Sequence, residues 1–301
     1  CSSDLSVEAL WQNRTKQRVL NFGSTKTLSV LPLVNWHKSR NDLRGEMGVS
    51  YLIKTDTNTI LFDLGHNAKE EDPSPLIHNM QKLGISLADV DTIFISHLHF
   101  DHIGGKKWEK KNTFSTGNTQ IELKVKQVFS PVSMTYPGLH PITTSEPTAL
   151  LSGVASMGTI LRQLFMGQIE EQALVVNVAG KGIVIFSGCG HQTLPKILKK
   201  AEETFQERIY GVIGDLHYPV PTGRLKLLGI NAQRFFASGD GPFQTIDEKE
   251  IERDITLVRN LNPGIVAVGG HDSSDEVIAR FADVFGSVYR HVRMGEWIRI
   301  Q

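Results

Sequence analysis

The sequence contains little cysteine and has no excess of either charge. Its two cysteines, Cys1 and Cys189, exclude a framework of disulfide bonds as the basis of the fold. Lysine and arginine together number 32, as do aspartate and glutamate, so the formal net charge is zero. Proteins that bind a phosphate backbone usually carry a basic excess. The charge balance therefore argues against nucleic acid as a partner, and a small molecule is the expected substrate.

Long hydrophobic runs are also absent. No apolar run approaches the roughly 20 residues that a transmembrane helix needs, and the sequence contains no signal peptide. The chain starts at Cys1, followed by Ser2, Ser3 and Asp4. Two interpretations of this start are open. Either Cys1 is the lipidated first residue of a mature bacterial lipoprotein, periplasmic or anchored to a membrane, or the chain was trimmed here and is cytoplasmic.

The composition suits one large α/β domain. The chain has 301 residues, of which 40% are hydrophobic, and this is enough apolar material for a substantial core. Residues 112–170 differ from the rest because they are rich in Thr, Ser, Gly and Pro. Such a composition predicts an irregular insertion that runs over the surface, either as a functional loop or as a plain insertion.

Five short apolar stretches predict buried strands, and each is followed closely by a histidine or an aspartate. They are "TILFD", "TIFISH", "IVIFSGCGH", "GVIGD" and "AVGGH". In layered α/β sheets, ligands gather outside the carboxyl ends of the strands. The fold is therefore expected to bring these polar residues together, although they lie far apart in the sequence.

The densest group of such residues is "SHLHFDHIGG", residues 96–105, which holds three of the 11 histidines. His97 and His99 are two residues apart just after a strand, so they point the same way in an extended backbone. Asp101 and His102 turn to another side, which fits a second metal ion. Neutral imidazoles suit zinc, although manganese and iron tolerate the same ligands. The spacing therefore predicts two divalent metal ions that share a bridging hydroxide.

These motifs resemble the metallo-β-lactamase superfamily, from about Leu28 to the C-terminus. The stretches "LFDLG", "SHLHFDHIGG", "FSGCGH" and "VGGHDSS" carry the resemblance, and "NMQKLGISLADVDTIFISHLHFDHIGG" looks like the branch that includes dihydropterin-ribofuranosylaminobenzene-phosphate synthases. The resemblance implies a four-layer αββα sandwich over residues 28–301, with residues 1–27 as an N-terminal extension. It also implies the metal ligands, namely His97, His99 and His191 for one ion, and Asp101, His102 and His271 for the other.

One departure from the superfamily concerns the residue that bridges the metals. Most hydrolytic members have an aspartate after the hairpin strand, where this chain has Cys189, with His191 two residues later. Three replacements are open: His191 supplies the missing function, the Cys189 thiolate binds metal, or Asp215 of "GDLH" reaches in. A buried, inert thiol is the other interpretation of Cys189.

Two further residues are candidates for the same site. Asp63 in "LFDLG" resembles the superfamily's aspartate that orients a ligand imidazole through its other ring nitrogen, unless it is a solvent-facing turn residue. His217 in "DLHYP" is a candidate for an acid that faces the substrate, for a further ligand, or for a structural histidine.

The expected function is that of a metal-dependent hydrolase. A metal-bound water or hydroxide attacks an ester, lactone or phosphoester of a small molecule, while Asp101 holds the nucleophile and assists proton transfer. No serine nucleophile competes, because the motif G-x-S-x-G is absent. The alternative is a metal-bearing ligand-binding or sensory protein of the same fold with little turnover, because the bridging aspartate is missing.

Overall fold

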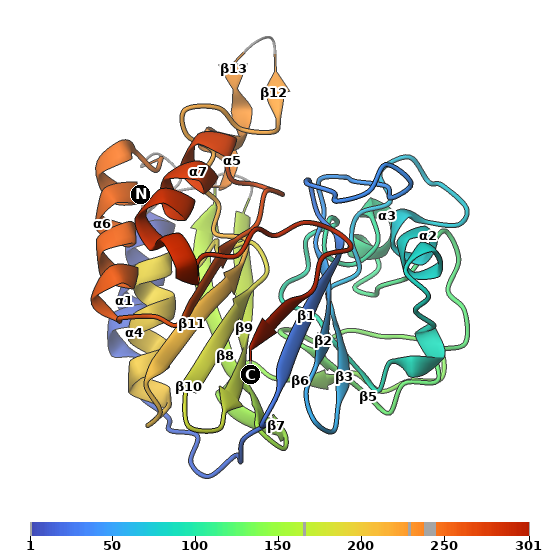
Figure 1. Cartoon of the computed structure of the whole chain (residues 1–301), viewed down its shortest axis with the longest axis horizontal. Coiled ribbons are helices and arrows are strands. Elements are labelled where there is room, and N and C mark those ends of the chain that lie inside the picture. Colours follow the sequence, from blue (N-terminus) through green and yellow to red (C-terminus); the bar gives the residue numbers. More distant parts are fainter. Residues whose placement is uncertain (1, 165–166, 228–229, 238–244, 301) are drawn as a thin grey trace.

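Two β-sheets lie face to face in the computed structural model, and helices cover the outer face of each (Figure 1). The structure describes residues 2–164, 167–227, 230–237 and 245–300. Cys1, and with it the predicted lipid anchor, lies outside these ranges. The four layers run helix, sheet, sheet, helix, so the predicted αββα sandwich is confirmed.

The first sheet has seven strands, and its outer face is covered by short helices. In spatial order the strands are β15 (Ile298–Ile300), β1 (Leu28–Val34), β2 (Ser50–Lys54), β3 (Thr59–Phe62), β4 (Thr92–Phe94), β5 (Gln127–Ser130) and β6 (Ile142–Thr143). The covering helices are α2 (Pro75–Lys82), α3 (Lys106–Glu109) and the 3-10 helix Leu87–Asp89.

The second sheet has six strands and longer helices. In spatial order the strands are β14 (Ile265–Val268), β11 (Ile209–Gly214), β10 (Gly182–Ser187), β9 (Gly167–Val178), β8 (Val154–Leu164) and β7 (Thr148–Leu151). Its outer layer contains α1 (Ser2–Asn13), α4 (Leu194–Thr204), α6 (Glu248–Asn260) and α7 (Asp275–Phe285).

A small hairpin and a short helix project from one end of the sandwich (Figure 1). They are β12 (Lys226–Leu227), β13 (Ile230–Asn231) and α5 (Ala232–Ala237). A second 3-10 helix, Gly286–Val288, follows α7. Within the described ranges, no helix is both long enough and apolar enough to cross a membrane.

Burial on both faces explains why the strands are almost continuously apolar. In β2, Tyr51 and Ile53 belong to the core between the two sheets, while Leu52 belongs to the core under α2. In β10, Val184 lies between the sheets and Ile185 packs toward α4. A strand with one wet face would alternate apolar and polar residues. The apolar runs in the sequence are thus the consequence of a sheet that sits between two other layers.

The prediction of an irregular insertion over residues 112–170 is wrong for its second half, which contains strands of both sheets. The 11-residue strand β8 is the clearest example. Its polar residues are misleading because they meet polar partners inside the sandwich rather than solvent. Ser156 Oγ, for example, donates a hydrogen bond of 2.5 Å to Gln172 Oε1 on β9. A Ser- and Thr-rich composition therefore marks a buried polar patch here, not a loop.

The strand directions place one edge of both sheets in the same region. Strands β3, β4 and β5 are parallel in the first sheet, and β10, β11 and β14 are parallel in the second. The carboxyl ends of parallel strands meet at one edge of a sheet. The two edges lie side by side because the sheets are packed face to face, and most of the predicted site residues follow these strands directly.

Candidate metal centre

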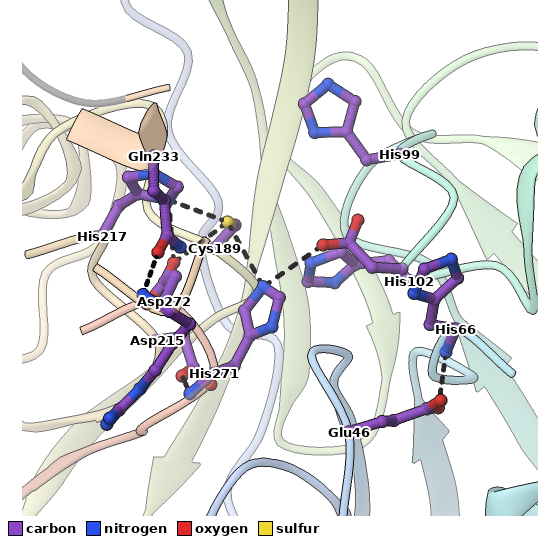
Figure 2. A network of polar contacts seen from close by, with 12 residues as sticks. Glu46, His66, His99, His102, Cys189, Asp215, His217, Gln233, His271 and Asp272 are labelled. Atoms are coloured by element: carbon purple, nitrogen blue, oxygen red, sulfur yellow. Dashed lines mark hydrogen bonds and ion pairs between the residues drawn. The ribbon is translucent and has the colours of Figure 1, made fainter. Parts of the chain in front are cut away.

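Five strand ends deliver the predicted site residues to one buried cluster. The residues and the strands they follow are Asp63 after β3, His97 to His102 after β4, Cys189 and His191 after β10, Asp215 and His217 after β11, and His271 after β14. Figure 2 shows that the labelled side chains of this group converge from both sheets. The expected convergence of distant residues is therefore what the structure contains.

Three imidazoles form one part of the cluster. His97 Nε2 lies 3.1 Å from His99 Nδ1, which in turn lies 3.1 Å from His191 Nε2. Burial, with the neighbouring His102, lowers the pKa of His97 well below its usual value, and the same causes lower the pKa of His99 to about 3. The rings of His97 and His99 are therefore neutral at physiological pH, which is the form that binds a metal ion.

Asp101, His102 and His271 form the second part. His271 Nε2 lies 3.4 Å from Asp101 Oδ2. His102 donates its Nδ1 proton to Asp63 Oδ2 at 2.7 Å, and its buried Nε2 has no partner among the described residues. Burial lowers the pKa of His271 to about 3. Burial also acts to lower the pKa of His102, but the carboxylates of Asp63, Asp101 and Glu171 together outweigh it and raise this pKa to about 9.

Asp63 connects the two parts through side-chain hydrogen bonds. Its carboxylate accepts from the Ser96 backbone N–H at 2.7 Å and from Ser96 Oγ at 2.6 Å, in addition to the bond from His102. Ser96 Oγ also lies 2.9 Å from His97 Nδ1. Asp63 is fully buried and has a φ of +54°, which is rare for a residue with a side chain. The structure thus places this carboxylate where it fixes the orientation of two imidazoles.

Cys189 occupies the middle of the cluster. Its Sγ lies 3.2 Å from His217 Nδ1, 3.8 Å from His271 Nε2 and 3.0 Å from Asp272 Oδ2, to which the thiol donates (Figure 2). Burial and the carboxylates of Asp272 and Glu171 raise the pKa of this thiol well above its usual value. In the absence of a cation Cys189 is therefore a neutral thiol surrounded by polar groups.

Asp215 lies at the edge of the cluster, and one of its oxygens is held by residues outside the candidate ligand sets. Its carboxylate accepts from the Tyr51 hydroxyl at 2.6 Å, from Asn35 Nδ2 at 3.0 Å and from the His271 backbone N–H at 3.0 Å. These three donors occupy its oxygens and hold it beneath His271. In this arrangement Asp215 supports the loop that carries His271, and the alternative that it replaces the bridging aspartate stays a prediction.

His217 is brought into the cluster and is backed by an acidic residue. Its Nδ1 lies 2.9 Å from Asp272 Oδ2, while its Nε2 is buried and has no partner in the described parts of the chain. When a carboxylate binds one ring nitrogen of a histidine, it sets the tautomer of the ring and the direction in which the other nitrogen points. This arrangement favours the functional interpretations of His217 over that of a structural histidine with both nitrogens satisfied.

Three contributing residues escape prediction from the sequence: Asp272, Glu171 and Arg162. Asp272 is adjacent to His271 in "GGHDSS", and an acidic residue beside a candidate ligand is a signal that could have found it. Glu171 and Arg162 lie inside β9 and β8, and Arg162 is only 2% exposed. Charged residues within otherwise apolar strands are the signal in their case, because burial of a charge requires a specific partner.

Glu171 and Arg162 hold the loop that carries Cys189 and His191. The Glu171 carboxylate accepts from the backbone N–H groups of Cys189 and Gly190, both at 2.9 Å, and of His191 at 2.8 Å. Arg162 Nε donates to the His191 carbonyl at 3.0 Å. The loop is therefore fixed through its backbone by side chains of the two neighbouring strands.

The side chains of the cluster fit a divalent metal ion. Three sets of ligand atoms each lie within 4.8 Å of one another, namely those of His97, Cys189 and His191, of His102, Cys189 and His271, and of Cys189, His217 and Asp272. Buried polar atoms are nearly always hydrogen-bonded in folded proteins, so the unpartnered His102 Nε2 needs a further explanation. Neutral imidazole, thiol and carboxylate together form a donor set suited to zinc and related ions.

The four-layer sandwich with this cluster at its strand ends is a metallo-β-lactamase fold. Comparison with known proteins gives the same fold. The sequence profile described as "Metallo-beta-lactamase superfamily" matches residues 43–114, which include the motif at 96–105. The predicted resemblance to the superfamily is confirmed.

Among curated proteins, the chain is similar to the 7,8-dihydropterin-6-methyl-4-(β-D-ribofuranosyl)-aminobenzene-5′-phosphate synthase of Methanocaldococcus jannaschii. The two are 25% identical over 245 residues, which cover 66% of this chain and 80% of the relative. This match agrees with the branch that the sequence motifs indicate.

Solved structures share the fold across most of the chain. A metal-dependent hydrolase of the β-lactamase superfamily has a TM-score of 0.60 and 18% identity, covering 91% of this chain and 99% of the other. The short form of human tRNase Z has a TM-score of 0.51 and 12% identity, with coverages of 91% and 99%. Since a tRNase has this fold, the argument from net charge against nucleic acid is not supported.

Proposed function

We propose that the protein is a metal-dependent hydrolase that cleaves an ester, lactone or phosphoester of a small molecule. The observation that supports this best is the buried convergence of imidazole, thiol and carboxylate groups from five strand ends. Divalent ions bound there would lower the pKa of a water molecule and stabilise the negative charge that develops on the attacked group. The residues that would hold them are His97, His99 and His191 for one ion, and Asp101, His102 and His271 for the other.

Two side chains are placed to move protons. Asp101 is the more accessible carboxylate of the cluster, 15% exposed, and holds His271 Nε2 with one oxygen. It accepts the proton of the attacking water. His217 is held at Nδ1 by Asp272, and its Nε2 donates a proton to the leaving group. Together they divide the acid and base roles between the two sheets.

A basic cavity beside the centre favours phosphoesters among the candidate substrates. The cavity has a volume of about 260 Å³, and its charged lining residues are Lys106, Lys107 and one acid, Glu70, with His66 beside them. It adjoins the end of the Asp101–His102 segment, and its two lysines are exposed. Ammonium groups attract a phosphate without demanding one geometry. The phosphate in the name of the curated relative agrees with this preference.

The test combines metal analysis with a substrate panel. We expect bound divalent metal in the purified protein, together with hydrolysis of a bis-phosphoester in preference to a neutral lactone. His102→Ala should lower the rate at least about 100-fold, because even residues that only orient a metal ligand are worth 10- to 100-fold. His140→Ala, which changes an exposed histidine, is the matched control and should have no effect.

A metal-loaded protein that turns over no member of the panel would instead support the alternative, a ligand-binding or sensory protein. Synthesis from a dihydropterin by the same site would support the role named for the curated relative. Including a short RNA in the panel also tests whether nucleic acid is a substrate.

A further inference from the structure

We infer that the Cys189 thiolate is a metal ligand shared by both halves of the centre, in the place where most hydrolytic relatives have an aspartate. This inference deepens the proposed function, since it rests on the proposal that the cluster holds divalent metal. It also indicates which metals the centre prefers.

The position of Sγ is the first argument. Cys189 is common to every set of candidate ligand atoms found in the described residues, one with His97 and His191 and another with His102 and His271. Ligands of one zinc ion lie about 2.3 Å (sulfur) and 2.1 Å (nitrogen) from it, so two such ligands are at most about 4.4 Å apart. The measured 3.8 Å between Cys189 Sγ and His271 Nε2 falls within this limit.

The second argument is the unpartnered nitrogen of His102. The ring is fully buried, its Nδ1 is bonded to Asp63, and its Nε2 has no partner among the described residues. A ligand atom of this ring lies within 4.8 Å of those of Cys189 and His271. A cation held between the sulfur and this ring would satisfy a buried nitrogen that otherwise costs free energy.

The surroundings of Cys189 are the third argument, because they differ from those of an inert buried cysteine. Such a cysteine behaves as a small apolar residue among apolar neighbours. Here two imidazoles and the Asp272 carboxylate lie within 3.8 Å of the sulfur (Figure 2). When a metal binds, the S–H bond breaks, the electron pair stays on sulfur as the ligand pair, and the proton passes to Asp272 and then to solvent.

The backbone holds the sulfur between the sheets. A Cβ on Gly188 would lie 2.2 Å from Ser96 Oγ of the first-sheet half. Gly190 has a φ of +79°, and a Cβ there would lie 2.8 Å from Leu216 Cα in the second. Glycine on both sides therefore lets the loop press against both halves of the centre, with Cys189 as the one side chain between them.

A shared thiolate makes the centre softer than one bridged by a carboxylate. Thiolate ligands select zinc, iron or cobalt over magnesium, calcium and manganese. Of the ions that the sequence left open, zinc and iron are therefore favoured and manganese is not.

Cobalt spectroscopy tests the inference independently of turnover. The metal-free chain of residues 1–301 is titrated with Co²⁺, whose visible d–d bands report occupancy and whose near-ultraviolet charge-transfer band reports thiolate ligation. We expect the charge-transfer band in the wild type and in Cys1→Ser, which removes the chain's other cysteine. The band should be lost in Cys189→Ser and in Cys189→Asp, with folding of each variant checked by circular dichroism.

Affinity for zinc gives a second readout from the same proteins. We expect Cys189→Ser to weaken zinc at least tenfold, and Cys189→Asp to recover part of that loss and to shift the preference toward manganese. Three results would overturn the inference. They are d–d bands without a charge-transfer band in the wild type, a charge-transfer band that persists in Cys189→Ser, and a failure to bind cobalt. A thiolate band in a protein without hydrolytic activity would support the inference and count against the proposed function alone.

Discussion

The two sheets contribute to the metal centre in different ways. The first sheet supplies a single contiguous segment, His97 to His102, which is oriented through side chains by Asp63. The second sheet supplies residues after three separate strands, and Glu171 fixes one of their loops by accepting three backbone N–H groups. A buried carboxylate stands behind each half, but one acts on imidazole rings and the other on the backbone.

This difference shows how a site can be robust in one half and adaptable in the other. Rings oriented by a side-chain hydrogen bond depend on the exact ligand types, so His97 to His102 have little freedom to change. A loop held by its backbone can change the side chain at position 189, because the N–H group there is the same for every residue except proline. The loop at 188–191 can therefore carry Cys189 in place of aspartate without altering the fold that supports it.

The largest effect is expected from Asp63→Asn. The amide has only one oxygen, so an N–H group of the variant would face a donor from Ser96 or His102. We expect metal affinity to fall by about 10- to 100-fold, as for other partners of metal-bound histidines. The metal-free protein should also lose about 3 kcal/mol of unfolding free energy, because the buried His102–Asp63 pair is broken. Chelator competition and urea unfolding measure the two quantities.

Asp91→Asn is the matched control for this prediction. Asp91 lies at the opposite end of β4, where it accepts from the Thr59 backbone N–H at 3.0 Å and pairs with Lys126 at 2.7 Å. Its replacement should leave metal affinity unchanged. Equal losses of affinity in both variants would show that general destabilisation of the first sheet, and not the orientation of His102, is responsible.

A smaller effect is expected from Glu171→Gln, which tests the other half. The glutamine offers one acceptor oxygen to three backbone donors, so at least one buried N–H loses its partner, at a cost of about 1–3 kcal/mol. We expect weaker metal binding, while the hydrogen bonds that Asp63 makes in the first half stay unchanged. Combining this change with Asp63→Asn gives a double-mutant cycle, in which additive losses indicate two independent supports.

Glu170→Gln is the control on the same strand. Glu170 is half-buried and accepts a hydrogen bond from Thr159 Oγ1 at 3.0 Å, away from the loop. Its replacement should not change metal affinity. Strong coupling in the cycle of Asp63 and Glu171 would refute the division into two halves, since both carboxylates would then act on one shared unit.

The same difference explains how much of the molecule could be predicted from the sequence. The sandwich follows from apolar runs separated by turns and helices, and local spacing also suffices for the capping box of α6, in which Asp247 and Glu250 are three residues apart. Two adjacent serines precede α7, and the cap is Ser274 because the Ser273 hydroxyl instead accepts from the Tyr218 backbone N–H. Tertiary contacts determine which of the two adjacent serines caps the helix, and the local sequence does not contain that information.

Site residues could be predicted where they lie next to one another in the sequence. His97 to His102 are visible as a motif because one strand end carries them all. The role of Asp215 as a support depends on where Tyr51 and Asn35 lie, and both belong to the other sheet. Glu171 likewise acts on residues 18 to 20 positions later in the chain. Such roles arise from the packing of the two sheets, and spacing in the sequence does not reveal them.

The smallest effect is expected on the outer face of the second sheet, at Lys200 of α4. Its Nζ donates to the Thr159 carbonyl at 2.7 Å, and burial lowers the pKa of Lys200 from 10.5 to about 8. Between about pH 8 and 10.5 the unfolded chain binds the proton more tightly than the folded one, so this residue makes stability rise with pH. Lys200→Met should lack that rise and gain about 1–2 kcal/mol at pH 7, measured by urea unfolding. Its metal affinity should stay unchanged, because Lys200 donates to the Thr159 carbonyl and not to the loop that Glu171 holds. A changed affinity would show that the second half extends to α4.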